Sequence, residues 1–203
     1  MERNKKVIDL SHHNTVASDL AAAKADGVLG VIHKMSDGSG MVDPKVKARY
    51  SLAKDAGLLW GIYEFLRPGD VNKQAAFFMA KALEAGVLDD DTLIACDFER
   101  AIPLIDVLHF LQTVERGTSR SPVLYSGNYL KDEGGAPACP PLVRYRLWMP
   151  QYGPTAVLPK GYDSYWLWQW TDKGKVSGIG GNVDLNHFDG TDDELSAQWS
   201  GKE

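Results

Sequence analysis

The sequence predicts an α/β fold, an irregular TIM-like (β/α) barrel with eight strands and fewer helices in its second half. Three observations support this prediction. Helix-like stretches alternate with apolar runs in the first half, and glycines recur there at the roughly 30-residue interval of a βα unit. Strand-like runs then continue in the second half with little room for helices between them. We expect residues 1–203 to form one domain.

Four apolar runs in the first half are predicted to be buried strands. They are apolar on both faces, which is typical of a parallel sheet that helices cover. Each is preceded by a helix-like stretch, except the first. The runs are residues 6–10, 28–34, 58–65 and 92–98.

The helix-like stretches of this half carry apolar residues at helical spacing, which indicates a face packed on the core. Ser18 is expected to cap the first of them, and Pro44 to occupy the first turn of the second. Gly27, Gly57 and Gly86 follow helix-like stretches and favour the left-handed conformation that ends a helix. The predicted helices are residues 18–26, 43–56, 70–85 and 103–116.

The second half contains four further strand candidates. Their spacing of about 20 residues is too short for a full crossover helix after each strand. The intervening sequence is rich in Gly and Pro, as in "DEGGAPACPP" and "KGKVSGIGGN". The strand candidates are residues 122–126, 145–149, 165–170 and 183–188.

The composition excludes several classes of function. The net charge of −5 argues against a nucleic-acid surface, which is usually basic. No stretch approaches the roughly 18 apolar residues of a membrane span. The glycines around residues 178–181 match neither the dinucleotide motif nor the P-loop, and "YSGNY" is not the G-x-S-x-G of a serine nucleophile. The start, "MERNKKVIDL", is not a signal peptide of the usual type.

Neither the two cysteines nor the five histidines have the spacing of a metal site. Cys96 lies in a predicted strand, where a small buried thiol is the simplest interpretation, and a disulfide to Cys139 is an open alternative. His12 and His13 are adjacent, so they point in opposite directions on an extended chain. We therefore expect no metal and no cofactor.

Polar and aromatic side chains gather where the predicted strands end. In barrel enzymes the carboxyl ends of the strands form the active-site face. An acidic groove flanked by Tyr and Trp suits a carbohydrate, because sugars present hydroxyl groups and stack on aromatic rings. The residues at these ends are Asp9, Lys34, Tyr63, Glu64, Asp97, Glu99, Tyr125, Trp148, Tyr152, Gln169 and Asp184.

Asp97 and Glu99, at the tip of "LIACDFE", form the central pair. Residues i and i+2 of a strand share a face and lie roughly 6.6 Å apart. Two carboxylates this close favour one protonated form, which can act as a general acid. Glycoside hydrolysis needs such a proton donor, and the spacing lies between the retaining and inverting values. A salt-bridged pair with Arg100 is the non-catalytic interpretation.

Seven segments resemble, in order, the glycoside hydrolase family 25 lysozymes. These segments are "VIDLSHHN", "GIYEFLRPGD", "DFE", "PVLYS", "LWMPQY", "LWQW" and "GNVDLNHFDG". The resemblance covers about residues 6–190 and implies an irregular eight-stranded barrel. It also implies N-acetylmuramidase activity, the hydrolysis of the β-1,4 bond between N-acetylmuramic acid and N-acetylglucosamine in peptidoglycan. The single domain would then be a catalytic glycoside hydrolase domain.

The resemblance also implies roles for individual residues. Glu99 would be the general acid, and Asp97 would assist the substrate or an intermediate. In a substrate-assisted route, which we favour, the N-acetyl group is the nucleophile and Asp97 orients it. Asp9 and Asp184 would complete the acidic site. The residues that match groove positions are Lys34, Tyr63, Tyr125, Trp148, Tyr152 and Gln169.

The sequence departs from the family pattern at two positions. His13 stands where an aromatic residue is common, and Glu64 replaces the histidine of a Y-H-F segment. We count Glu64 among the substrate-binding candidates, because it could raise the pKa of Glu99 or pair with Lys34.

Two other functions stay open: a non-catalytic glycan-binding protein on the same barrel, and a chitinase-like hexosaminidase. The chain lacks the D-x-x-D-x-D-x-E run of common barrel chitinases. We expect a monomer that acts on peptidoglycan glycan strands in the cell wall, in the periplasm or outside the cell, and binds neither nucleic acid nor membrane. A phage or prophage endolysin made in the cytosol would fit, as would a secreted enzyme whose leader was removed.

Overall fold

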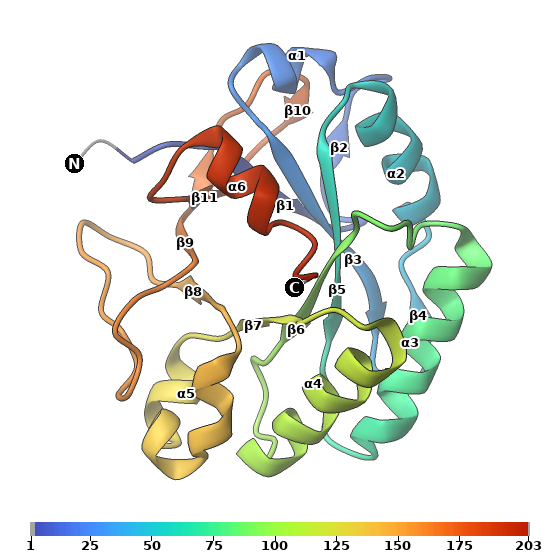
Figure 1. The fold of residues 1–203 in the computed structure, drawn as a ribbon. Coiled ribbons are helices and arrows are strands. Elements are labelled where there is room, and N and C mark those ends of the chain that lie inside the picture. The colour runs from blue at the N-terminus through green and yellow to red at the C-terminus, as the bar shows by residue number, and fades with distance from the viewer. Residues whose placement is uncertain (1–2, 203) are drawn as a thin grey trace.

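A computed structural model describes residues 3–202, and a closed barrel of eight strands forms its centre (Figure 1). The predicted fold class is confirmed, and each of the eight predicted strands is present. Met1, Glu2 and Glu203, the ends of the predicted domain, lie outside the described residues. The barrel strands are β1 (Val7–Leu10), β3 (Gly30–Asp37), β5 (Leu59–Phe65), β6 (Leu93–Asp97), β7 (Val123–Tyr125), β8 (Leu147–Pro150), β9 (Leu167–Gly174) and β11 (Val183–His187).

Strand direction is uniform around the barrel except at β11. The pairs from β1 through β3 to β9 are parallel, whereas β11 is antiparallel to both of its neighbours, β9 and β1. Only eight residues separate Gly174 from Val183, fewer than a parallel crossover needs. The amino end of β11 therefore lies at the same rim as the carboxyl ends of the other strands.

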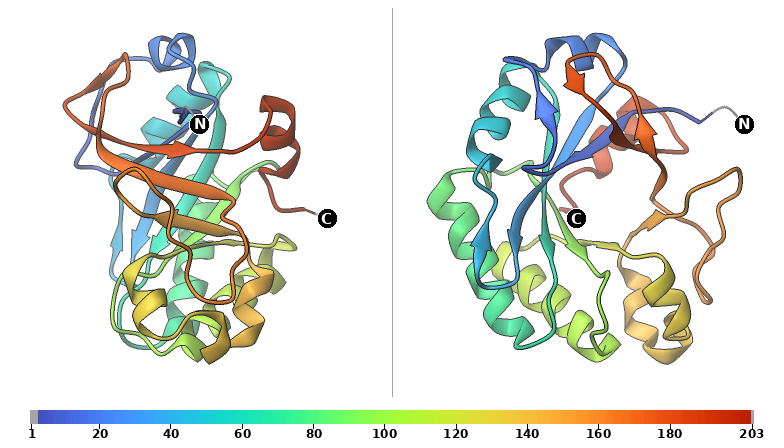
Figure 2. Two further views of the ribbon diagram at one scale, coloured as in Figure 1. Left: turned by 90° about the vertical axis from the view of Figure 1, so that its left-hand side faces the viewer. Right: turned by 180° about the vertical axis from the view of Figure 1, so that it is seen from behind.

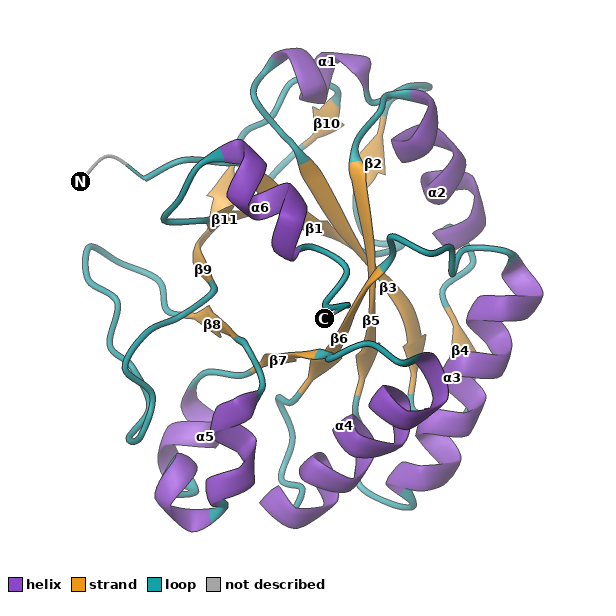
Figure 3. Ribbon diagram, viewed as in Figure 1, coloured by secondary structure: helices purple, strands orange, loops and turns teal. Residues whose placement is uncertain are grey.

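The helices cover the outside of the barrel, mainly along its first half (Figures 2 and 3). Between β7 and β8 there are only a short helix and two 3₁₀ turns, and no helix joins β8 to β9 in the part of the chain that the structure describes. This distribution matches the prediction. The elements are α1 (Ala21–Ala25), α2 (Val46–Asp55), α3 (Val71–Ala85), α4 (Leu104–Thr118), α5 (Asn128–Asp132), η1 (Ala136–Ala138) and η2 (Pro140–Arg144).

Two predicted helix starts are wrong. Helix α1 begins at Ala21 after Leu20, and the Ala21 backbone N–H donates to Asp19 Oδ1, so Ser18 is not its N-cap. Pro44 precedes the residue at the N-cap position of α2 and is not in its first turn. The predicted helix ends are confirmed: the φ angles of the three glycines that follow α1, α2 and α3 are 94°, 66° and 67°.

Three short strands were not predicted. β2 (Thr15–Val16) pairs with β10 (Ile179–Gly180) in a separate ribbon, and β4 (Met41–Val42) pairs with the end of β3. Cys96 and Cys139 are both buried and free, so the structure does not contain the disulfide that the sequence left open. Among residues 3–202, no helix combines the length and apolar character needed to cross a membrane.

The apolar core has two parts, one inside the barrel and one between the barrel and its helices. The inner part ends at α6 (Asp192–Gln198), which lies across the amino end of the barrel in Figure 1. Leu195 and Trp199 are fully or almost fully buried there, and the Trp199 indole N–H donates to Trp60 O at 2.7 Å. A Cβ on Gly30 would lie 2.6 Å from the Trp199 ring, so only glycine fits at that position.

Helix α6 was also not predicted, although the sequence contains its start signal. Thr191 accepts from the Glu194 backbone N–H, and the Glu194 carboxylate accepts from the Thr191 backbone N–H. This capping box follows the pattern T-x-x-E. Because α6 closes the amino end of the barrel, the rim at the carboxyl ends of the parallel strands is the end left open to ligands.

Candidate active site

The central acidic pair lies where the sequence predicted it. Asp97 is the last residue of β6 and is buried, and Glu99 follows in the loop toward α4 and is half-buried. Phe98, between them, packs in the core outside the barrel. Because alternate residues point to opposite faces, this leaves Asp97 and Glu99 on the inner side.

Asp9 lies at the same rim and is held by two buried amides. Asp9 is the register partner of Asp184 across the antiparallel β1–β11 pair. Its Oδ2 accepts hydrogen bonds from Gln169 Nε2 and Asn186 Nδ2, both at 2.9 Å. These contacts favour the carboxylate form of Asp9. We had not identified Asn186 from the sequence, although it shares a face with Asp184 at a spacing of two residues.

Aromatic donors fix the orientation of both amides. Tyr125 Oη and Tyr152 Oη donate to Gln169 Oε1 at 3.0 and 3.1 Å. Trp148 Nε1 donates to Asn186 Oδ1 at 2.6 Å. Each amide oxygen is therefore turned toward an aromatic donor and each amide nitrogen toward Asp9.

The aromatic rings themselves form the inner wall of the rim. The Tyr125 and Trp148 ring centroids lie 4.5 Å apart at 67°, and Tyr63 meets Trp148 edge-on at 6.4 Å. All three side chains are at least 90% buried. Such contacts restrict the rings to one arrangement, so the wall beside the acids is rigid.

The four carboxyl groups share one electrostatic environment, and the pKa of each is raised. Burial is the largest cause in every case, and it raises the pKa of Asp9 to about 6 and that of Asp184 to about 8. Repulsion adds to this effect, because the charge of Glu99 raises the pKa of Asp97, Asp9 and Asp184. The site therefore favours states in which some of these groups keep a proton.

Burial affects the pKa values of Asp97 and Glu99 to different extents. Burial raises the pKa of Asp97 well above its usual range, and its Oδ1 has no hydrogen-bond partner among the described residues. Burial also raises the pKa of Glu99, while the positive charges of Arg100 and Lys34 lower it. Lys34 Nζ is 3.3 Å from Asp37 Oδ2 at the end of the same strand. These cations moderate the pKa of Glu99 but do not cancel the effect of burial.

Glu64 does not face the groove, which corrects the expectation that it shares a face with Asp9 and Asp184. It is fully buried and is the register partner of Cys96, which belongs to the core outside the barrel. Its Oε2 accepts a hydrogen bond from the Ser36 hydroxyl. Tyr63, the preceding residue, occupies the inner face, so Glu64 must point outward. Burial raises the pKa of Glu99, and Glu64 is not among the groups that shift it.

Burial raises the pKa of Glu64 to about 8, which predicts a pH-dependent stability. Between the ordinary value of 4.5 and about 8, the folded protein binds this proton and the unfolded chain does not. The free energy of unfolding should therefore fall as pH rises through that window, by an amount on the order of a few kcal/mol. Glu64→Gln, which keeps an acceptor for Ser36, should remove this loss in urea unfolding at pH 5 and pH 8.5.

The matched control for that experiment is Glu84→Gln, on the exposed face of α3. Its pH dependence should equal that of the wild type. Equal slopes in the wild type and Glu64→Gln would show that Glu64 is ionised in the folded protein across this range.

His12 and His13, from the segment "VIDLSHHN", are not part of the aromatic inner wall. His12 Nδ1 is 2.9 Å from Asp43 Oδ2, and Asp43 also accepts the His12 backbone N–H at 2.8 Å. His13 is exposed, with its ring centroid 3.9 Å from that of His12. No group of three or more His, Cys, Asp or Glu residues within 3–202 is arranged to hold a metal ion.

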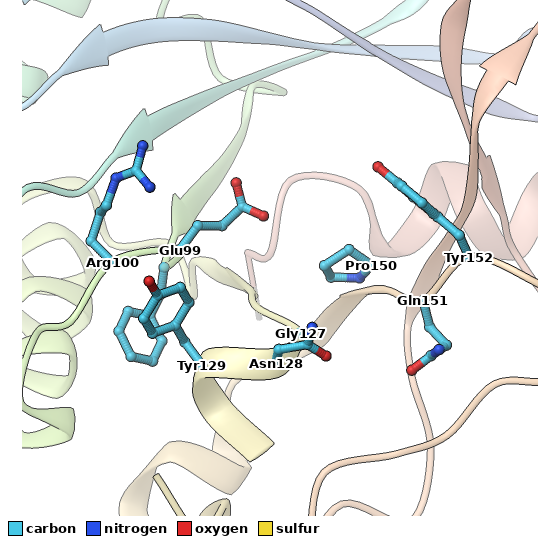
Figure 4. A pocket seen from close by; sticks show the side chains of 9 residues that line it. Glu99, Arg100, Gly127, Asn128, Tyr129, Pro150, Gln151 and Tyr152 are labelled. Atoms are coloured by element: carbon cyan, nitrogen blue, oxygen red, sulfur yellow. The ribbon is translucent and has the colours of Figure 1, made fainter. Parts of the chain in front are cut away.

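A pocket of about 400 Å³ opens at this rim, with Glu99 and Arg100 on one side and Tyr152 on the other (Figure 4). Of the predicted site residues, only Glu99 and Tyr152 line it. Asp9, Asp97 and Asp184 do not line it, and Asp9 is linked to Tyr152 through Gln169. Sequence reasoning had not placed the loop after β7 in the site. The lining residues are Phe98, Glu99, Arg100, Gly127, Asn128, Tyr129, Pro150, Gln151 and Tyr152.

Comparisons with known proteins show what this chain is similar to. A family model described as Glycosyl hydrolases family 25 matches residues 8–179. The uncharacterized protein YegX of Escherichia coli O157:H7 is 28% identical over 169 residues, which cover 81% of this chain and 60% of that protein. Lysozyme M1 of Streptomyces globisporus is 25% identical over 220 residues, covering 94% of this chain and 69% of that protein.

The fold is also similar to a solved structure. The bacterial lysozyme from Streptomyces coelicolor superposes with a TM-score of 0.82 over 97% of each chain, at 22% identity. This likeness concerns the fold. The chain spans about 60% of the length of YegX, so similarity to that protein covers only a part of it.

Proposed function

Because this chain belongs to the glycosyl hydrolases family 25, we propose that it is a lysozyme of the N-acetylmuramidase type. It hydrolyses the β-1,4 bond between N-acetylmuramic acid and N-acetylglucosamine in bacterial peptidoglycan. Residues 1–203 act as a single catalytic domain that is monomeric, and the glycan strands of the cell wall are its binding partner.

One observation carries this proposal: four carboxyl groups from distant segments meet at one rim of the barrel, and the pKa of each is raised. Buried carboxylates destabilise a fold unless they are paired and hydrogen-bonded, and a glycan-binding surface has no need of this costly arrangement. Hydrolysis of a glycosidic bond requires a proton donor together with negative charge near the oxocarbenium-like centre. The carboxyl groups at this rim can supply both.

Glu99 acts as the general acid, because it is the member of the group that lines the pocket and its raised pKa favours the protonated form. It donates its proton to the glycosidic oxygen as the bond breaks. Asp9 and Asp184 complete the acidic floor of the site, where two amide hydrogen bonds favour the charged form of Asp9. Lys34, Tyr63, Tyr125, Trp148, Tyr152 and Gln169 form the wall and position the sugar.

Asp97 assists a substrate-assisted route. Its Oδ1 is buried and has no partner among the described residues, and it would accept a hydrogen bond from the N–H of the substrate's N-acetyl group. The carbonyl oxygen of that group then attacks the anomeric carbon as the leaving oxygen takes the proton of Glu99. Water opens the resulting ring with net retention of configuration. An NMR time course in which the inverted anomer appears first would contradict this route.

Clearing of purified cell walls, followed by analysis of the new reducing ends, tests the activity and the bond. We expect soluble fragments that end in reducing N-acetylmuramic acid. Fragments that end in reducing N-acetylglucosamine would assign a different bond. Binding to walls with no release of fragments at any pH would contradict the enzymatic function.

The cell wall is the proposed place of action, outside the cytoplasmic membrane. The structural relatives include an endolysin, CTP1L, at 28% identity. We propose that this chain is likewise an endolysin, and that it acts on peptidoglycan reached through release from the cell.

A further inference from the structure

Three cations surround one aromatic ring at the edge of the pocket. Phe65, the last residue of β5, has Lys34 Nζ and Arg67 Cζ each 4.6 Å from its ring centroid and Arg100 Cζ at 5.1 Å. We call Phe65, Lys34, Arg67 and Arg100 the cationic shelf. Cations near the face of an aromatic ring are held by its quadrupole, so the shelf keeps its charges in place without neutralising them.

One acid balances part of this charge. Asp37 accepts from Arg67 Nη2 at 3.0 Å and lies 3.3 Å from Lys34 Nζ. Arg100 is exposed and makes no hydrogen bond or ion pair within the described part of the chain. Asp37 is thus the one acid that forms ion pairs with these cations within residues 3–202. Glu99 is also near, because the positive charges of Arg100 and Lys34 lower its pKa.

The shelf adjoins the reaction site and extends away from it. Arg100 lines the pocket next to Glu99, and Figure 4 shows both on the side opposite Tyr152. Arg67 lines a second hollow of about 380 Å³, formed by the ends of β3 and β5 and the start of α3. The shelf therefore connects the pocket to this second hollow.

The substrate offers a matching charge beside the sugar. The glycan backbone of peptidoglycan is uncharged apart from its substituents, and each muramic acid carries a lactyl group that is joined by an amide bond to a short peptide. That stem peptide bears several carboxylates. Guanidinium groups bind carboxylates with directional hydrogen bonds.

We propose that the cationic shelf binds carboxylates of the stem peptide on the muramic acid next to the cleaved bond, so that the enzyme prefers peptide-bearing glycan. This inference rests on the proposed muramidase function. The extent of the shelf, from Arg100 across Phe65 to Arg67, suits a chain with more than one carboxylate better than the single lactyl group. Arg100 is the group with no other partner and takes the first carboxylate.

Arg100→Gln tests the shelf on three soluble preparations made from sonicated walls. The first is untreated. In the second, carbodiimide and an amine have converted the carboxylates to neutral amides. In the third, an amidase has removed the peptides and left a lactyl carboxylate. We expect the variant to raise KM on untreated glycan about threefold to fivefold, the range of an exposed charge pair, and to change KM much less on the other two.

Two further variants sharpen the result. Arg100→Lys keeps the charge and should recover part of the lost affinity for untreated glycan. Arg116→Gln makes the same change on the exposed end of α4 and should match the wild type on all three preparations. The wild-type preference for untreated over amidated glycan should also decrease as salt is raised from 0.05 to about 0.5 M.

Each alternative has its own outcome. An equal change in KM on all three preparations would overturn the proposal that the cationic shelf binds carboxylates, because the effect of Arg100 would then not depend on substrate charge. If Arg100→Gln changes KM as much on amidase-treated glycan as on untreated glycan, the carboxylate that Arg100 binds is that of the lactyl group. This result would overturn the proposal that the shelf binds the stem peptide. A wild type that cleaves none of the preparations would contradict the muramidase function itself, which is a separate result.

Discussion

Glu99→Gln is expected to lower kcat for wall hydrolysis by roughly 10²–10⁴-fold, the usual contribution of a general acid. Glutamine keeps the shape of the side chain but has no proton to give to the leaving oxygen. Binding should persist, because the amide can still form hydrogen bonds in the pocket. Removal of one charge should also lower the pKa of Asp97, which the charge of Glu99 raises. The measurements are the rate of fragment release and the retention of glycan on the inactive variant.

The matched control is Glu133→Gln, at the exposed end of α5. It makes the same chemical change away from the rim and should keep the wild-type rate. If Glu99→Gln retains more than about a tenth of the wild-type kcat, Glu99 is not the proton donor.

Trp199→Ala is expected to lower the free energy of unfolding by about 3–5 kcal/mol, the range for truncation of a buried tryptophan. The side chain is 1% exposed, packs beside Gly30 and donates to Trp60 O. Its removal leaves a cavity at the closed end of the barrel and an unpaired buried carbonyl. Urea unfolding followed by circular dichroism, analysed for midpoint and slope, measures the change.

Val157→Ala serves as the control, because Val157 is 54% exposed in the loop between β8 and β9. It should change the unfolding free energy by less than about 0.5 kcal/mol. A loss below about 1 kcal/mol in Trp199→Ala would show that α6 contributes little to closure of the barrel.

Much of the fold follows from local patterns in the sequence. Apolar runs predicted all eight barrel strands, and the short spacing in the second half predicted the missing helices. The resemblance to the lysozyme family is confirmed by the family model. The two-residue spacing of Asp97 and Glu99 placed both on the inner face, because strand periodicity is a local property.

Whether a residue at a strand end faces the inside or the outside of the barrel was harder to predict. Tyr63 and Glu64 are neighbours at one strand end, so only one of them can face inward. The sequence does not show which, because the phase is set by packing against β3 and β6. The antiparallel direction of β11, in contrast, could have been predicted. Only eight residues separate β9 from β11, which is too few for a parallel crossover.

The position of Asp184 illustrates a second limit. We expected it at a carboxyl strand end, whereas it is the second residue of β11 and reaches the rim because that strand runs in reverse. Its pairing with Asp9 joins residues 175 positions apart, and no local pattern contains such a contact.

The pairing of β1 with β11 also sets the order in which a growing chain can acquire activity. Asp9 emerges early from the ribosome, but the partners Asp184 and Asn186 follow some 175 residues later. The barrel cannot close before then, because contacts between distant segments form late. A nascent chain therefore carries Glu99 without a completed floor to its site, and we expect the proposed activity only after synthesis has passed β11.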